Sequence, residues 1–306
     1  MAGFYSEHDV AELNKAKDDL HGKFSALKDG LIARKFKSDR GRAYAFEGLV
    51  RRLDTMIRAI DYVFNTLPPE KEDVPDTDDT VAATILIQSF IINLQGCLDN
   101  LAWIWVYETN QKGKCGRDLD RRAVGLGDGY WLLRRSFSKP FRKYLKSRKK
   151  WFRHVMEFRD SLAHRIPLYV LPFIVSGPNV TEFNRLQREA FAATDYKTYL
   201  ELKAKQEKLG AYRPWMTHSP TEGAPVAVFH QQMLQDFLTI DECANKLLEE
   251  IDTFVPGKSS SILGQLCVCG WDASATLSFI GPRESVRLRA GYMTHTNSTS
   301  RGLLPF

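Results

Sequence analysis

The sequence predicts a mainly α-helical protein organised as a helical bundle, and three observations carry this prediction. Apolar residues recur at steps of three and four over several long segments, which is the period of an amphipathic helix. One uncharged segment, residues 80–98, is long enough for a core helix, whereas β-like patterning is confined to short runs around Pro172. With 43% hydrophobic residues in 306, the chain can bury a sizeable core.

Two amphipathic helices are expected near the N-terminus, over residues 10–27 and 42–64. Both have apolar residues spaced so that they share one helix face. Residues 65–79 then contain three prolines and six acidic residues, a composition typical of a loop. We therefore expect residues 1–67 to form an N-terminal helical hairpin that extends the bundle.

A long apolar helix is expected over residues 79–109, and its length would also suit a membrane span. Gln88, Asn93 and Gln95 lie inside its uncharged stretch. Each amide would be costly against lipid, whereas helices packed in a bundle can hydrogen-bond to it. We therefore expect a buried core helix and no membrane partner.

The remainder of the chain alternates helices with loops. A helix is expected over residues 139–165, either continuous or broken near Ser147, and Pro167 ends it because proline disfavours helical geometry in the residue before it. The other expected elements are a five-glycine loop (113–129), β-like runs (168–171 and 173–175), a polar helix or helix pair (181–209), a Pro/Gly loop (210–225) and a final amphipathic helix (229–254). Together they predict a helical bundle over 78–256 with an insertion at 177–225, followed by a poorly ordered tail over 257–306.

The positive charge of the chain is local. Eight basic residues and no acidic residue lie between Lys139 and Arg153, which is more than the net charge of +6. Five of them follow steps of three and four and would form one basic stripe suited to an RNA backbone: Lys139, Arg142, Lys146, Lys149 and Arg153. The alternative interpretation is a solvated surface helix that binds nothing.

The cysteines and the N-terminal residues indicate a reducing compartment. The five cysteines are odd in number and lack the spacing of a disulfide framework or a zinc site. The first residues do not combine a basic segment with an apolar one, as a secretory signal would. We therefore expect a cytoplasmic protein without a metal or another cofactor.

Three residues near the end of the helix over 139–165 form the candidate site: Arg159, Asp160 and His164. Asp160 and His164 are one helical turn apart, so the carboxylate can orient the imidazole and fix its tautomer. Arg159 follows the apolar face and lies roughly 140° around the helix from His164. A second copy of the helix could therefore complete the site, which predicts a homodimer. The same residues could instead form a buried ion-pair network that only stabilises the bundle.

The Arg-x4-His spacing is not specific by itself, because Arg213 and His218 repeat it. Pro214 excludes a helix at that second position. The helical context of Arg159 and His164 is what distinguishes them.

With its Arg-polar-x3-His pattern at a helix end, the segment over residues 158–169, FRDSLAHRIPLY, resembles the signature of the HEPN superfamily. The segment over residues 97–103, CLDNLAW, is similar to the first long core helix of those helical bundles. The resemblance covers roughly residues 80–255, so the N-terminal hairpin and the tail lie outside it.

The resemblance implies a metal-independent endoribonuclease that acts as a dimer, such as a toxin or an antiviral effector. His164 would act as general acid or base, Arg159 would hold the scissile phosphate and Asp160 would orient His164. An antitoxin or another protein partner would then control the activity. Toxins of this kind that are controlled by nucleotidyltransferase antitoxins carry a tyrosine two residues after the histidine, where this chain has Ile166.

Two alternatives remain open at the level of sequence. One is a non-catalytic HEPN-like bundle that binds RNA, a nucleotide or a protein partner. The other is an unrelated helical protein in which Arg159, Asp160 and His164 are structural.

Overall fold

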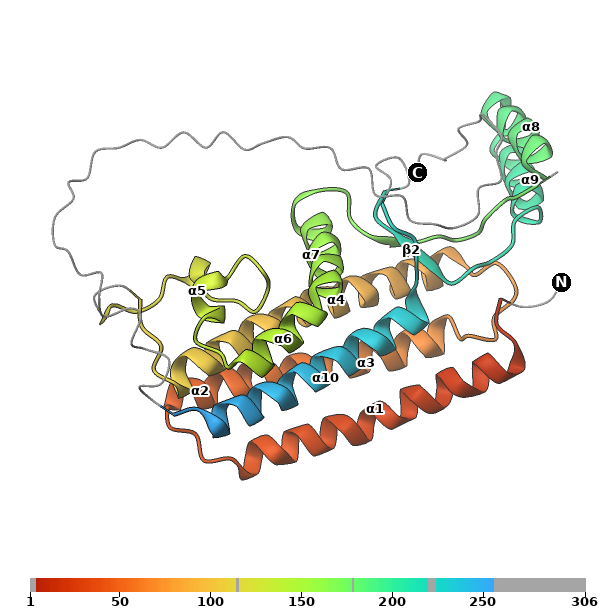
Figure 1. The fold of residues 1–306 in the computed structure, drawn as a ribbon. Helices are drawn as coiled ribbons and strands as arrows, with labels where there is room; N and C mark the ends of the chain where they lie inside the picture. The colour runs from red at the N-terminus through yellow and green to blue at the C-terminus, as the bar shows by residue number, and fades with distance from the viewer. Residues whose placement is uncertain (1–3, 114–115, 178, 220–223, 256–306) are drawn as a thin grey trace, which may run out of the picture. The chain divides into compact units, whose positions relative to one another are not determined.

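The computed structural model describes residues 4–113, 116–177, 179–219 and 224–255 (Figure 1). Helices dominate the described residues, which confirms the predicted fold class at that level. The tail predicted over 257–306 lies outside the described residues.

The first helix, α1 (Glu7–Ala33), starts at a capping box. The Ser6 hydroxyl accepts the Asp9 N–H at 3.2 Å, and the Asp9 carboxylate accepts the Ser6 N–H at 3.0 Å. Its buried stripe consists of leucines at steps of seven and four: Leu13, Leu20, Leu27 and Leu31. That stripe packs against α3 (Arg51–Thr66) and α10 (Phe229–Thr253).

Residues 39–66 form one run of helix with three geometries: α2 (Asp39–Ala43), the π-helix η1 (Tyr44–Val50) and then α3. The sequence predicted an ordinary α-helix over 42–64, so the π-helix is a correction. Hydrophobic spacing did not reveal it because both helix types bury one stripe of residues. Gly48 of η1 lies against α4 (Thr77–Glu108), where an added Cβ would be 2.6 Å from Asn100 Nδ2.

Helix α4 lies at the centre of the bundle, with α3, α10 and α7 (Lys149–His164) packed against it. Phe90, Leu94, Leu101 and Trp105 are among its buried residues. By length and composition α4 is also the one helix in the described ranges that could cross a membrane. The core helix of a bundle passes the same test, and α4 packs against α3, α10 and α7 with 44% of its most apolar window buried.

The segment after α4 returns to the bundle through the short helices η3 (Arg121–Ala123) and α5 (Trp131–Arg134). Helices α6 (Lys139–Ser147) and α7 follow, separated at Arg148, whose φ of −91° and ψ of 8° are not helical. Figure 1 shows that α7 runs in a different direction from α6. The predicted single basic stripe is therefore wrong as a continuous surface, because the helix breaks within it.

A small antiparallel sheet follows α7, in the order β1 (Tyr169–Val170), β2 (Trp215–Thr217) and β3 (Ala227–Val228). Tyr169 pairs with Thr217, and Trp215 pairs with Val228. The sequence predicted the β-like character near β1 but assigned β2 to a loop. Between β1 and β2, α8 (Asn179–Ala192) and α9 (Tyr196–Glu207) pack on each other, as the expected helix pair would.

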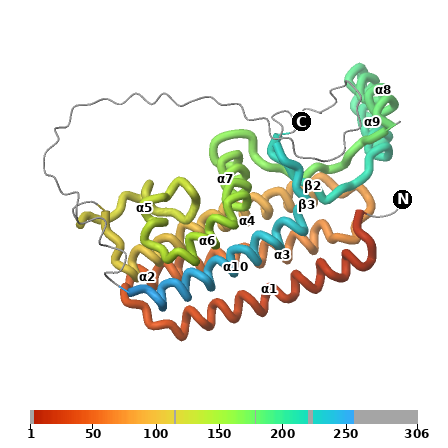
Figure 2. Tube along the Cα trace, in the orientation of Figure 1, coloured from red at the N-terminus to blue at the C-terminus, as the bar shows by residue number. Residues whose placement is uncertain are grey.

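One hydrophobic core connects the long helices, whose paths Figure 2 traces. It includes Leu20 of α1, Leu53 of α3, Leu101 of α4, Phe158 of α7 and Phe237 of α10. The N-terminal helices thus share a core with helices α4, α7 and α10.

Candidate functional site

The predicted site lies on the last turns of α7. Phe152, Val155, Phe158 and Ser161 form the buried face of this helix. The helix ends at His164, and the chain then passes through Pro167 into β1. Residues beside that buried face therefore project from a helix end that is anchored in the core.

Arg159 and Asp160 pair with each other, with Arg159 Nη1 donating to Asp160 Oδ1 at 2.8 Å. Their side chains are 42% and 39% exposed, so this is a surface ion pair. His164 is exposed, and its side chain makes no hydrogen bond or ion pair with any residue that the structure describes. The expected bond between Asp160 and His164 is thus replaced by the bond to Arg159, whose permanent charge attracts the carboxylate more strongly than a neutral imidazole does.

A carboxylate from α4 joins this surface. Burial raises the pKa of Asp99 above its ordinary value, while the Gln95 amide, 3.0 Å away, and the nearby charge of Arg159 act against that rise. Arg52 of α3 acts on Asp99 in the same direction as Arg159. The charges of two guanidinium groups from different helices, Arg159 of α7 and Arg52 of α3, therefore both act on Asp99.

Arg52 is held flat against α4. Its Nε donates to Asn100 Oδ1 and its Nη1 donates to Asn93 Oδ1, both at 3.1 Å. Gly96 makes room for it, because an added Cβ there would lie 2.4 Å from Arg52 Cζ. Sequence reasoning missed Arg52 and Asp99, although polar residues inside a long apolar helix were a signal that something packs on them.

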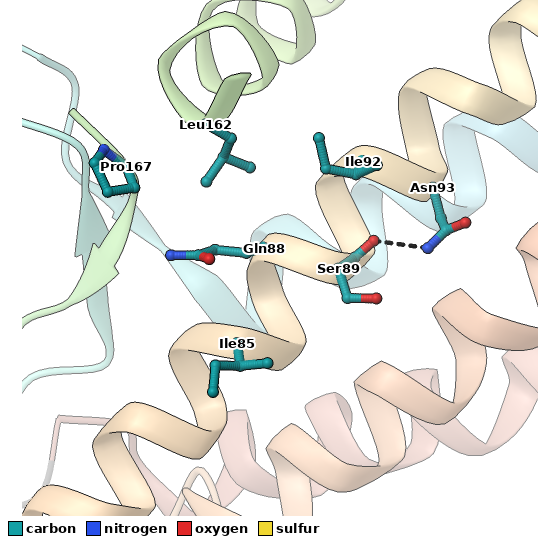
Figure 3. Close-up of a pocket in the computed structure, with 7 residues that line it drawn as sticks. All are labelled: Ile85, Gln88, Ser89, Ile92, Asn93, Leu162 and Pro167. Carbon is teal, nitrogen blue, oxygen red and sulfur yellow. Dashed lines mark hydrogen bonds between the residues drawn. The ribbon is translucent and has the colours of Figure 1, made fainter. Parts of the chain in front are cut away.

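A groove runs between α4 and the chain that follows α7 (Figure 3). Its volume is about 330 Å³, and its lining includes Ile85, Gln88 and Ile92 on α4 together with Leu162 and Pro167. Gln88 Nε2 donates to the backbone oxygen of the residue after Pro167 at 2.6 Å, which fixes that segment against α4. The groove thus adjoins the helix end that carries His164.

One face of α4 next to the groove is apolar and exposed. Val81, Ile85 and Ile92 are 51%, 60% and 42% exposed, and their spacing places them on one face of the helix. Met156 of α7 and Ile166 add exposed apolar area on the segment that carries the motif. Solvent-exposed apolar residues grouped in this way are typical of a protein contact surface.

The five predicted RNA-binding residues lie on two helices. Lys139, Arg142 and Lys146 are on α6, while Lys149 and Arg153 are on α7. Lys149 is paired with Asp128 at 3.0 Å, and its hydrogen bond is the largest cause of the lowered pKa of that carboxyl. The other four make no ion pair with any residue that the structure describes, so they remain available to an anion.

The second Arg-x4-His segment does not form a comparable site. Arg213 lies over the ring of Phe4 at 5.7 Å, whereas His218 is buried against Phe158 of α7 with ring centroids 5.7 Å apart. His218 Nε2 is 3.8 Å from Glu157 Oε1. Strand β2 separates the arginine from the histidine, as expected from the exclusion of a helix by Pro214.

The described residues contain no group of three or more His, Cys, Asp or Glu side chains that could hold a metal ion. Comparisons with protein-family models, curated proteins and solved structures find no match.

Proposed function

We propose that the protein is a metal-independent endoribonuclease of HEPN type. The observation that carries the proposal is an exposed His164 at the end of α7, one turn from the exposed pair of Arg159 and Asp160. An imidazole can transfer protons near neutral pH, and a guanidinium can hold a phosphate by two parallel hydrogen bonds. No other exposed histidine in the described residues lies beside such a pair on one helix end.

The reaction assigned to these residues is attack of an RNA 2′-oxygen on the adjacent phosphorus. A general base removes the 2′-hydroxyl proton, the new P–O bond forms, and the bond to the 5′-oxygen breaks as a general acid protonates that oxygen. His164 is suited to either proton transfer. Arg159 stabilises the negative charge that grows on the phosphate.

A homodimer supplies both proton transfers. One His164 would act as base and the partner's His164 as acid, with two Arg159 side chains around one phosphate. The exposed apolar face of α4, formed by Val81, Ile85 and Ile92, supports a contact between two copies because it adjoins the motif. The basic residues of α6 and α7 would guide the RNA backbone towards the shared cleft.

Such an enzyme would suit a cytoplasmic toxin or antiviral effector, with an antitoxin or another protein covering the cleft until cleavage is needed. This biological role depends on the proposed RNA cleavage, and a protein that does not cleave RNA would not have it.

A cleavage assay in EDTA tests the proposal. We expect the wild type to cleave single-stranded RNA, and His164→Ala and Arg159→Ala to lose about 10²-fold or more of that rate, as expected for removal of an acid–base or charge-stabilising group. His8→Ala and Arg58→Ala are matched controls, because His8 is exposed on α1 and Arg58 forms a surface pair with Asp54. Cleavage that survives both site substitutions, or that requires a divalent metal, would overturn the proposal.

One observation favours a second function, a non-catalytic bundle that only binds RNA. Asp160 is paired with Arg159 and leaves His164 without an orienting carboxylate. RNA binding that decreases with salt, without any cleavage by the wild type, would support this second function.

A further inference from the structure

Three aromatic side chains form a cluster beyond the candidate site. Trp103 and Tyr107 of α4 are stacked with ring centroids 5.4 Å apart and an interplanar angle of 23°. Tyr44 of the π-helix η1 lies 5.8 Å from Trp103 and 5.5 Å from Tyr107. All three residues are half-buried, so each keeps part of its side chain open to solvent.

Positive charges surround this cluster. The guanidinium of Arg40 lies over the Tyr107 ring at 5.7 Å and is exposed. Burial raises the pKa of Tyr44, and the charges of Arg121 and Arg40 act against that rise. An aromatic surface flanked by guanidinium groups is suited to a flat, electron-rich ring that is linked to an anion.

A buried carboxylate fixes the position of the cluster. Glu108, one residue after Tyr107, accepts the backbone N–H groups of Lys37 and Ser38 at 2.9 and 3.1 Å. Gly41 of α2 lies so close that an added Cβ would overlap the Glu108 carboxylate. The start of α2 is thereby held against the end of α4, and the following turn brings Arg40 and Tyr44 over the rings. A π-helix such as η1 is uncommon and is often found at functional sites.

The cluster continues a polar face of α4 that starts at the candidate site. Asn93, Gly96 and Asn100 share a face with Trp103 and Tyr107, because they follow steps of three and four. Arg52 lies across the first three of these residues. Asp99, on which the charges of Arg159 and Arg52 both act, is only four residues before Trp103, or about 6 Å along the helix axis.

We infer that Tyr44, Trp103 and Tyr107 form a stacking platform for a nucleobase of the RNA strand whose backbone is held at Arg52 and Arg159. This inference rests on the proposed function and adds to it a base-binding subsite on the α4 face. Stacking on aromatic rings tolerates every base, so the subsite would favour unpaired RNA over duplex RNA without selecting a sequence.

The test uses a single-stranded RNA that carries the fluorescent adenine analogue 2-aminopurine, together with the same strand lacking bases. We expect binding to quench 2-aminopurine, and Tyr107→Leu and Trp103→Leu to remove most of the quenching. Their affinity for the base-containing strand should fall about 5- to 150-fold, while affinity for the abasic strand stays unchanged. Trp103→Phe should retain the quenching because it keeps a ring.

A matched control lies on α9. Tyr199 stacks with Tyr196 at 6.2 Å and has Lys203 over its ring at 5.8 Å, so Tyr199→Leu removes a similar aromatic–cation cluster elsewhere on the chain. This control should quench and bind as the wild type does. If Trp103→Leu does not fold, the half-exposed Tyr107 provides the deciding variant, with folding checked by circular dichroism.

The outcomes separate the two proposals. The platform would be overturned if Tyr107→Leu quenched 2-aminopurine as strongly as the wild type does, or if the wild type bound abasic and base-containing strands equally well. RNA cleavage in EDTA could still stand in either case. Quenching that Tyr107→Leu removes, in a protein that never cleaves RNA, would overturn the nuclease and retain the platform. Quenching of free 2-aminopurine nucleotide as strong as that of the strand would overturn the assignment to RNA.

Discussion

The buried carboxyl group of Asp236 makes the stability of the protein depend on pH. Asp236 lies on α10 and is 3% exposed, and its Oδ1 accepts hydrogen bonds from Trp151 Nε1 at 2.7 Å and Gln232 Nε2 at 2.8 Å. Burial raises the pKa of this carboxyl from 3.8 to about 7, and no charged neighbour among the described residues contributes to that pKa. The side chain therefore keeps its proton in the folded state up to nearly neutral pH.

The size and sign of the effect follow from this pKa. A difference of about three pH units at about 1.4 kcal/mol per unit corresponds to roughly 4 kcal/mol. Below pH 4 the carboxyl is protonated in both the folded and the unfolded state and has no effect. Between pH 4 and 7 only the unfolded state ionises, so the free energy of unfolding falls, and above pH 7 the loss stays constant.

Asp236→Asn should remove this dependence, because asparagine keeps an acceptor for Trp151 and Gln232 but does not ionise. Its NH₂ group replaces a carboxyl oxygen and would cost about 1–3 kcal/mol if left unpaired. We therefore expect the variant to be less stable than the wild type by about 1–3 kcal/mol at pH 4, and more stable by a similar amount at pH 8. Urea unfolding at several pH values measures both differences.

Asp29→Asn is the matched control, because it makes the same substitution on the exposed surface of α1. A constant difference between Asp236→Asn and the wild type from pH 4 to 8 would refute the reasoning.

Three further predictions concern the surface. Lys146→Ala should reduce the steepness of log affinity for single-stranded RNA against log salt concentration by about 0.7. Lys149→Ala should change this slope less, because Lys149 is already paired with Asp128. Filter binding at several salt concentrations measures both slopes. Ile85→Glu should convert the proposed dimer to a monomer, as measured by light scattering after size exclusion. Ile32→Glu is the control and should not, because Ile32 is 62% exposed on α1, away from this face. A monomeric wild type would contradict the dimer. Gly22→Ala should raise the free energy of unfolding by about 0.5–1 kcal/mol in urea, because an added Cβ meets no atom within 4 Å in the middle of α1; a destabilised variant would contradict this estimate.

The long helices could be predicted from the sequence because the spacing of apolar residues along each helix shows which face is buried. The leucine stripe of α1 and the apolar run of α4 indicate buried faces without knowledge of any partner. The π-helix and strand β2 were not predictable in this way. The geometry around Gly48 depends on the approach of Asn100 from another helix, and β2 pairs with β1 across the inserted helices α8 and α9.

The candidate site shows the same limit. The motif on α7 was visible because Arg159, Asp160 and His164 are close in sequence. Arg52 and Asp99 were not assigned, because the bonds of Arg52 to Asn93 and Asn100 and the effect of the Arg159 charge on Asp99 arise only when α3, α4 and α7 pack together. Glycines provided an unused signal: Gly96 and Gly48 are each placed where another residue would meet a polar side chain.

Sequence spacing did not predict the hydrogen-bond partner of Asp160, because the choice between two partners within reach depends on their interaction energies. Spacing allows Asp160 to reach either the adjacent Arg159 or His164 one turn on, and the structure has it on Arg159 at 2.8 Å. An exposed ion pair of this kind contributes no more than about 1 kcal/mol, so a bound phosphate that takes the guanidinium can release the carboxylate at little cost. Asp160 would then be free to accept a hydrogen bond from the N–H of the His164 imidazole. In the proposed nuclease the substrate itself would thus complete the orientation of the general base, and Asp160→Asn should lower the cleavage rate without weakening RNA binding. Equal loss of binding and cleavage would instead make Asp160 a structural partner of Arg159.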